Sequence, residues 1–304
     1  MQNFITALKA EHLKKKGTGI YLVAIIVSAL LPVTFMTATL VQGTERLGKG
    51  LPYNHYQNFI EQPLSGFTDF FFPLLIIITA SRITQLDHRN GGWQLMETQP
   101  IKKSSIYFSK FTVLLETNLI AILSFTALSF AMAGIVELGM ALPKNATADF
   151  ETGRFLLLIL RIFLAGLFFT ALQYCISVLL PSFIWSIVIG FAILLLQGIL
   201  AVNGLNFDWY PIQILDKVSK YPLGSQLGYP ITYSEVASIL LAMIVLYIGF
   251  NWYRHKKFTW AFFGSAQRGA GVGGCGHTLW RVAGVHTYPE PDGTPRQNCC
   301  CGYY

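Results

Sequence analysis

Charged side chains are scarce in this sequence. Asp, Glu, Lys and Arg together make up 12% of its 304 residues, whereas hydrophobic residues make up 53%. An average soluble domain carries about 25% charged residues. Apolar runs of about twenty residues, long enough to cross a bilayer, separate the few charged stretches. The composition therefore excludes an ordinary soluble domain and indicates a polytopic membrane protein.

Motifs for catalysis and nucleotide binding are also missing. The sequence contains no G-x-x-x-x-G-K-[ST] phosphate loop, no H-E-x-x-H and no G-x-S-x-G. The Gly-rich stretch 269–274 lacks the following Lys that a phosphate loop requires. We therefore expect a chain that is not an enzyme and binds no cofactor of its own. Uphill transport would draw on a partner ATPase or on an ion gradient.

Cysteine is sparse and unevenly placed. Cys175 lies in an apolar run and the other four cysteines lie in the last thirty residues, so no disulfide framework is indicated. The Gly-rich segment 261–304 has no helical or strand period. A metal site built from its Cys and His residues is one interpretation, but three consecutive cysteines do not converge easily on one ion. We expect instead no metal and an irregular, disordered tail, or a sequence altered at the gene end.

Six apolar spans are expected within residues 1–260, which form one transmembrane domain. Their predicted limits are 19–41, 66–84, 106–138, 154–180, 183–203 and 235–253. The fold class is thus all-α, with polar loops at 42–65, 85–110, 139–153 and 204–234. The last loop has the pattern of a short amphipathic helix near 212–218. The basic segment 1–16 is either an amphipathic helix in the membrane interface or a charged flank that orients the first span.

The charge distribution predicts the orientation of the spans. Net charge is +7, and Lys and Arg concentrate in segment 1–16, in loop 85–110 and after the sixth span. Positive charge beside spans marks the cytosolic side, so we expect both termini and loop 85–110 in the cytosol. The basic residues follow the spans and no nucleic-acid motif is present, so we expect the lipid bilayer, and not nucleic acid, as the charged partner.

Five ionisable residues fall inside the expected spans, where a charge is costly and therefore informative. They are Asp69, Arg82, Glu116, Glu137 and Arg161. Three of them lie near span ends, from which a side chain can reach water. Glu116 and Arg161 lie deeper, so each either faces the bundle interior or snorkels to the surface. Asp69 and Glu137 are the candidate partners of Arg161.

Loop 85–110 carries an ordered set of residues between the second and third spans. In sequence these are Asp87, then Gly91-Gly92-Trp93, Thr98-Gln99-Pro100-Ile101, Lys102-Lys103 and Lys110. An acidic residue, Gly-x-Trp, Thr-x-Pro-Ile, basic residues and a Lys that opens the next helix resemble the cytosolic loop of type-2 ABC exporter permeases. Within these, the loop most resembles the bacitracin-resistance and lantibiotic-immunity branch. It departs from the pattern where Asp stands for the usual Glu and where Gly92 directly precedes Trp93.

This resemblance implies a permease subunit of the bacterial cytoplasmic membrane that exports an amphiphilic substrate, such as a peptide antibiotic or a lipid-linked molecule. A second permease subunit would pair with it, and separate ABC ATPase subunits would bind the ATP. A short helix at 93–98 would dock on the ATPase, with Trp as anchor, since interfaces favour Trp; the alternative for this Trp is a membrane anchor. The residues assigned to the contact are Asp87, Gly92, Trp93, Glu97, Pro100, Lys102 and Lys103.

Two other functions fit the same sequence. A membrane anchor or assembly protein would hold a soluble partner without moving a substrate. An ion-coupled carrier would work from a gradient alone and would depend on Glu116 or Arg161, although the spans are sparse in midplane charge.

Overall fold

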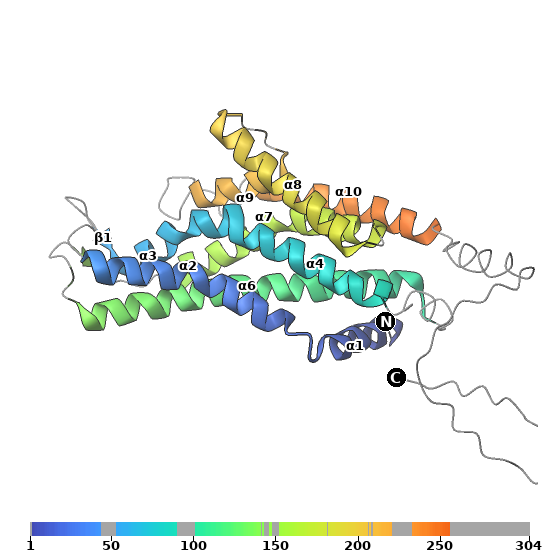
Figure 1. Ribbon diagram of the computed structural model, residues 1–304, viewed down its shortest axis with the longest axis horizontal. Helices are drawn as coiled ribbons and strands as arrows, with labels where there is room; N and C mark the ends of the chain where they lie inside the picture. The colour runs from blue at the N-terminus through green and yellow to red at the C-terminus, as the bar shows by residue number, and fades with distance from the viewer. Residues whose placement is uncertain are drawn as a thin grey trace, which may run out of the picture. The chain divides into compact units, whose positions relative to one another are not determined.

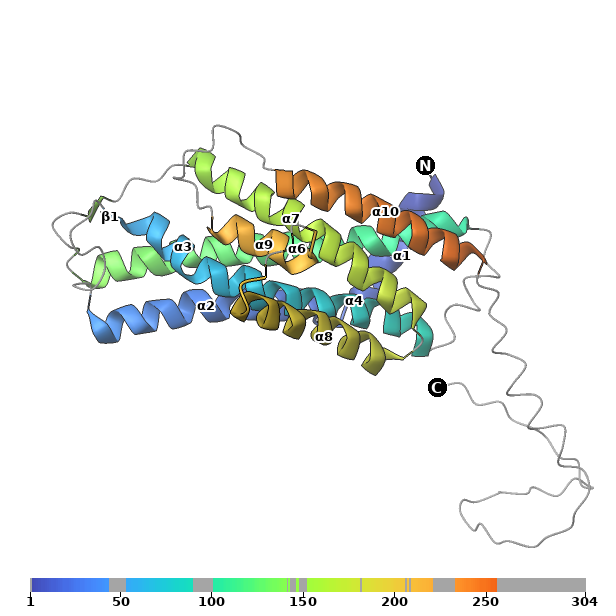
Figure 2. The same ribbon diagram turned by 90° about the horizontal axis from the view of Figure 1, so that it is seen from above.

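The computed structural model describes residues 2–43, 53–89, 101–140, 142, 146–147, 152–180, 182–205, 207, 209–220 and 233–255. Within these residues six helical spans are long and apolar enough to cross a membrane: Ile20–Gln42, His55–Asp87, Lys103–Gly139, Phe155–Leu179, Phe183–Val202 and Tyr233–His255. The predicted all-α membrane fold with six spans is therefore confirmed (Figures 1 and 2). The predicted tail 261–304 lies outside the described residues.

The amino-terminal segment is a helix, α1 (Gln2–Lys15), which packs mainly on α6 (Lys103–Gly139). Gly17 and Gly19 follow it with φ angles of 93° and 69°, in the left-handed region that favours glycine. They allow the chain to turn sharply into α2 (Ile20–Gln42), which also packs along α6. Of the two alternatives for segment 1–16, the helix is present, and it contacts both α6 and the end of the second span.

The second span is longer than the sequence predicts. It consists of α3 (His55–Gly66), the π-helical turn η2 (Phe67–Phe71) and α4 (Phe72–Arg89). The Asn54 side chain accepts a hydrogen bond from the backbone N–H of Gln57 at 3.1 Å and caps α3, which buries Phe59 and Leu64. The expected polar loop 42–65 is therefore wrong over nearly half its length, from His55 onward, because a capped, half-apolar helix continues the span outward.

The other boundaries follow the sequence more closely. The third span, α6, begins three residues before the predicted limit, while α7 (Thr152–Leu179), α8 (Phe183–Val202) and α10 (Tyr233–His255) match the predicted spans four, five and six. Two-residue strands, β1 (Tyr53–Asn54) and β2 (Ala146–Thr147), pair in parallel.

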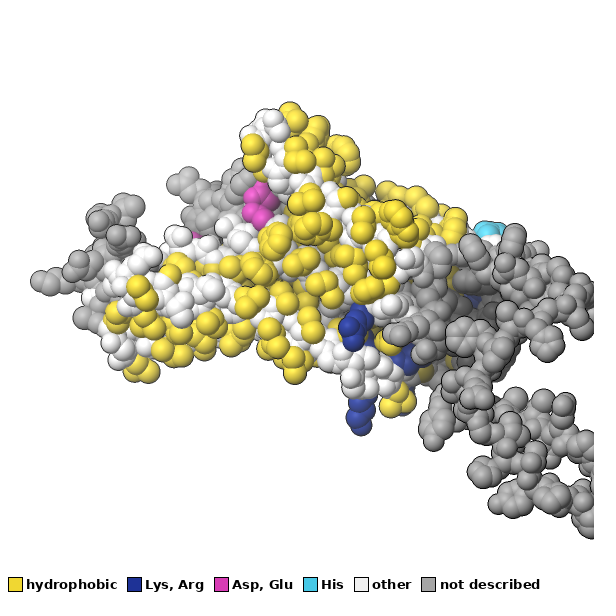
Figure 3. Space-filling model, viewed as in Figure 1, with side chains coloured by type: hydrophobic (Ala, Val, Ile, Leu, Met, Phe, Trp, Pro, Cys, Tyr) yellow, Lys and Arg dark blue, Asp and Glu magenta, His cyan; other side chains and the backbone are white. Residues whose placement is uncertain are grey.

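The predicted amphipathic helix after the fifth span is α9 (Pro211–Lys220). It packs against α7 and η2, and its apolar residues Ile212, Ile214, Leu215 and Val218 are completely buried. These side chains join a core in which the rings of Phe67 and Phe125 stack at 4.2 Å between centroids. By contrast, α2, α8 and α10 expose apolar side chains, as Figure 3 shows on one face, which suits contact with lipid.

Candidate functional site

One end of the bundle gathers the helix ends that flank the loop between the second and third spans. The end of α4 and the start of α6 meet α1 there. The start of α6 also meets the ends of α7 and α10, because the ring of Tyr107 lies 5.0 Å from that of Tyr174 and 5.6 Å from that of Tyr253. A force applied to the loop would therefore reach four spans and α1 at this end.

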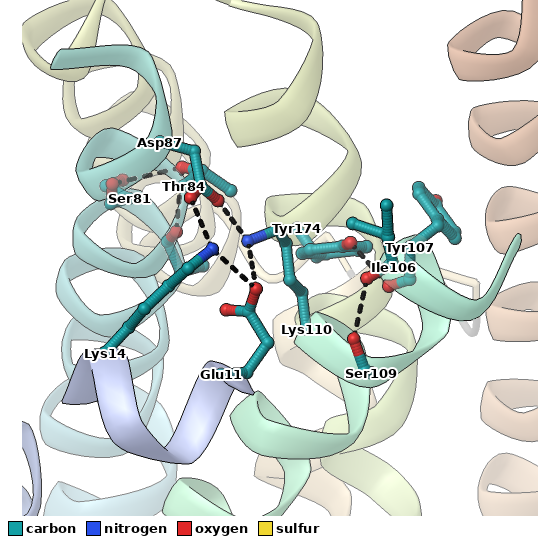
Figure 4. A network of polar contacts seen from close by, with 11 residues as sticks. Glu11, Lys14, Ser81, Thr84, Asp87, Ile106, Tyr107, Ser109, Lys110 and Tyr174 are labelled. Carbon is teal, nitrogen blue, oxygen red and sulfur yellow. Dashed lines mark hydrogen bonds and ion pairs between the residues drawn. The ribbon is translucent and has the colours of Figure 1, made fainter. Parts of the chain in front are cut away.

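Four charged side chains meet at this end and form what we call the base cluster: Glu11 and Lys14 from α1, Asp87 from α4 and Lys110 from α6 (Figure 4). The Lys110 ammonium donates to Glu11 Oε1 at 2.8 Å and to Asp87 Oδ2. The Lys14 ammonium donates to Glu11 Oε1 at 3.1 Å and to Asp87 Oδ1 at 3.0 Å. Each lysine thus bridges both carboxylates, and the cluster joins three helices.

The base cluster is buried, although its members carry charge. Lys110 is completely buried and the Glu11 and Asp87 side chains are 8% and 3% exposed, while Lys14 keeps 39% of its side chain exposed. Two positive and two negative groups cancel, which offsets the cost of removing them from water. Burial lowers the pKa of Lys14, but the carboxylates of Glu11 and Asp87 outweigh burial and raise that pKa above its ordinary value.

Further contacts hold α1 along α6. His12 Nε2 lies 2.8 Å from Glu116 Oε2. The Lys15 ammonium donates to the carbonyl of Val113 at 2.9 Å and to Thr117 Oγ1 at 3.1 Å. The face of α1 that contacts the bundle is therefore polar, and direct hydrogen bonds and ion pairs determine its position.

An aromatic cluster continues the same end of the bundle toward α7 and α10. The Tyr174 hydroxyl donates to the carbonyl of Tyr107 at 2.7 Å, and the Tyr107 hydroxyl lies 3.3 Å from Cys175 Sγ. A Cβ at Gly249 of α10 would lie 2.4 Å from that sulfur and 2.7 Å from the Tyr107 hydroxyl. The glycine therefore lets α10 approach the cluster closely.

The structure places only part of the predicted ATPase contact. Asp87 lies in α4 and not in a loop, and it is buried. Lys102 directly precedes α6 and Lys103 begins it; both are exposed, and Lys110 lies inside the helix, as the predicted span 106–138 implies. The loop is thus shorter than 85–110, because both ends continue as helix once their charges are paired. Gly92, Trp93, Glu97 and Pro100 lie outside the described residues.

The two deeper charges have partners that sequence reasoning did not consider. Glu116 contacts His12 on α1 and keeps 38% of its side chain exposed, so it lies at the bundle surface. Arg161 Nε donates to Glu235 Oε1 of α10 at 2.7 Å, with both side chains buried. Glu235 begins the predicted sixth span, and Glu137, a candidate partner of Arg161, accepts instead a 2.5 Å hydrogen bond from the Tyr56 hydroxyl.

Sequence reasoning missed Glu11 as a member of the site. Glu11 is an acidic residue in a segment otherwise chosen for its positive charge, and it stands three and four residues before Lys14 and Lys15. On a helix this spacing places all three side chains on adjacent positions. This spacing was the signal in the sequence for a role of Glu11. It does not identify Lys110, which lies 99 residues away, as a partner of Glu11.

The base cluster holds helices in place and has no reacting group. Its lysines are shared between carboxylates, and nothing in its geometry resembles a nucleophile activated by a base. What the arrangement can do is transmit displacement, because moving α4 or α6 separates buried opposite charges unless α1 moves with them.

These features define a multi-pass α-helical membrane protein with a charged junction beneath the second and third spans. Comparison with family models then gives a more specific result: residues 7–197 match the model described as ABC-2 family transporter protein, and the chain belongs to that family. The match extends from α1 into α8 and covers the base cluster. A permease of this family is a membrane transport component that associates with an ABC ATPase. Neither the curated proteins nor the solved structures give a significant match.

Proposed function

We propose that this chain is the permease subunit of an ATP-driven exporter in the bacterial cytoplasmic membrane, paired with a second permease and powered by separate ABC ATPase subunits. The observation that carries the proposal is the base cluster, which fastens both helices flanking the loop to α1. A loop contacted by an ATPase needs such a junction, because force on flexibly attached helices would be lost as local bending.

The mechanism starts at the loop. Trp93 and Glu97 contact a cleft on the ATPase, and Lys102 and Lys103 face the ATPase or anionic head groups at the end of α6. Closure of the ATPase pair on ATP displaces the loop. The buried Lys110–Asp87 contact makes α4 and α6 move together, and Glu11 brings α1 with them.

The orientation in this proposal follows from charge. The end that holds the base cluster also holds the basic residues of α1, the start of α6 and the end of α10. Positive charge of this density favours the cytosolic side, where an ATPase would dock. The substrate is proposed to be amphiphilic, such as a peptide antibiotic or a lipid-linked molecule, in line with the resemblance of the loop to that of immunity permeases.

The experiment is purification of the full chain from its native membrane in mild detergent, followed by identification of the proteins that accompany it. We expect an ABC ATPase with a phosphate-loop motif and measurable ATP hydrolysis. Trp93→Ala with Glu97→Ala should reduce the amount of ATPase recovered. Trp209→Ala is the matched control. Trp209 is an exposed tryptophan, but it follows the carboxyl end of α8 and is not part of loop 85–110.

Three results would reject the proposal. The double variant could retain the ATPase as well as the parent chain does, or Trp93 could be labelled from outside the cell. The third is substrate movement in vesicles that contain this chain and no nucleotide hydrolase, which would favour an ion-coupled carrier. A recovered partner without any substrate movement would instead favour a membrane anchor.

A further inference from the structure

A cavity of about 650 Å³ opens where α1 meets α2. It exists because the chain turns at Gly17 and Gly19, and a Cβ at either glycine would meet nothing within 4 Å. The two glycines are thus used for their backbone conformation and not for close packing, and the turn leaves a wedge between the helices. The wedge lies beside the base cluster but shares none of its four residues.

One wall of the cavity is positively charged. Lys15 and Lys16 both line it, and Lys16 is exposed. The Lys15 ammonium lies 4.7 Å from the ring centroid of Tyr21, another lining residue. His12 also lines the cavity, and the Glu116 carboxylate lies against it. Even with His12 neutral, two lysines against one carboxylate leave this wall positive.

The other side of the cavity is apolar and faces outward. Leu13, which is 71% exposed, and Leu22, which is 60% exposed, both line it. The exposed apolar face of α2 continues beyond Leu22 with Ile25 and Ile26. In Figure 3 the Lys and Arg side chains over α1 border the apolar surface of the spans. A ligand here meets positive charge at one end and a hydrocarbon-like surface at the other.

We propose that this cavity binds one anionic glycerophospholipid, with its phosphate at the exposed Lys16, close to the charge of the buried Lys15, and an acyl chain along Leu22 and the outer face of α2. A soluble anion would leave the apolar side uncovered, and a zwitterionic lipid would gain less from the excess positive charge. Basic pockets beside transmembrane helices recognise anionic head groups in this way. The lipid would hold α1 against the start of α2, next to the base cluster.

The test is native mass spectrometry of the full chain in detergent, titrated with phosphatidylglycerol, phosphatidylcholine or glycerol phosphate. We expect phosphatidylglycerol to bind more tightly than phosphatidylcholine. Lys16→Gln should weaken phosphatidylglycerol binding about fivefold, since one lysine near the surface contributes about that factor. Lys9→Gln removes the same charge from an exposed position on α1 that does not line the cavity, and it should change binding less than about twofold.

A second pair of variants tests the apolar side. Leu13→Asn should weaken phosphatidylglycerol binding, whereas Ile5→Asn, exposed on the same helix but outside the cavity, should not. Equal losses in Lys16→Gln and Lys9→Gln would mean general surface attraction and would overturn the site. Competition by glycerol phosphate would indicate a soluble anion, and equal binding of the two lipids would remove the role of charge; either result overturns the proposal.

Discussion

Two buried ionic sites in this protein differ in what they join. The ion pair Arg161–Glu235 connects α7 to α10. The base cluster connects α1, α4 and α6, and it includes one lysine that remains partly exposed. Both sites compensate buried charge, but only the base cluster lies between helices that the chain itself links by a loop. Burial of charge alone therefore does not indicate a transmitting role; the elements that the charges connect do.

The largest effect is expected at Lys110. Lys110→Met leaves two buried carboxylates with one partly exposed lysine between them, so the unfolding free energy in mild-detergent micelles should fall by about 3–5 kcal/mol. Lys103→Met, exposed at the start of the same helix, is the control and should change stability by less than about 0.5 kcal/mol. Similar losses in both variants would contradict the importance of burial in the base cluster.

A rescue experiment sharpens the comparison. Lys110→Met with Asp87→Leu keeps the Glu11–Lys14 pair, so stability should largely return. The amount of ATPase recovered should match that of the parent chain, but substrate movement should be impaired, because α4 and α6 no longer share a buried ionic contact. If the double variant transports normally, the base cluster only stabilises the fold.

The second largest effect is expected at Arg161. Arg161→Met leaves Glu235 buried without this partner, and we expect a loss of about 3 kcal/mol. Adding Glu235→Gln removes the charge of the buried carboxylate and should restore most of the stability together with transport. Loss of transport in this stable double variant would mean that the Arg161–Glu235 pair also has a transmitting role. The two ionic sites would then not differ in function.

An intermediate effect is expected from pH through Lys15. Burial lowers the pKa of Lys15 to about 8, although Glu116 and Glu11 oppose this shift. The unfolded chain keeps this proton up to the ordinary pKa of 10.5, so the contribution of Lys15 to stability rises with pH from about 8 to 10.5 and is lost as pH falls through 8. Between pH 7 and 9 the gain is on the order of 1 kcal/mol.

Unfolding of the parent chain and of Lys15→Met at both pH values measures this contribution. The difference between the two chains isolates Lys15 from the other titrating groups. A difference that stays constant with pH would mean that the pKa of Lys15 is not lowered.

The smallest effect is expected at Lys14. Its side chain is 39% exposed, so water screens its ion pairs, and Lys14→Gln should cost about 0.5–1 kcal/mol. Adding salt should reduce this cost further, while the cost of Lys110→Met should depend little on salt. Equal salt dependence in the two variants would place both lysines in similar surroundings, against the structure.

Sequence reasoning recovered the elements that have a local signal. The six spans and α9 follow from runs of apolar residues and from the helical spacing of Ile212, Leu215 and Val218. The limits of loop 85–110 were misplaced because polar residues at helix ends look like loop residues until their partners are known. Asp87 is helical and buried because Lys14 and Lys110 neutralise it, and those residues lie 73 and 23 positions away.

The candidate site was recovered in the same uneven way. The resemblance of the loop assigned Asp87 to the ATPase contact, and this role stays a prediction; packing shows that Asp87 pairs with Lys14 of α1 and with Lys110. The Arg161–Glu235 contact spans 74 positions, and no residue pattern along a single helix predicts which of several acidic residues a distant arginine meets. The proposed roles of Trp93 and Glu97 stay predictions.

The π-helical turn at Phe67–Phe71 affects the side-chain direction of a residue much further along the same span. A π-helical turn contains one residue more than a regular helical turn would, and each helical residue advances the side-chain direction by about 100°. If the same residues formed an ordinary helix there, with none removed, everything after the turn would be rotated by about that angle. Asp87, sixteen positions and roughly 24 Å further along, would then point away from both of its lysines. The direction in which the Asp87 side chain points therefore depends on a turn near the opposite end of its own span.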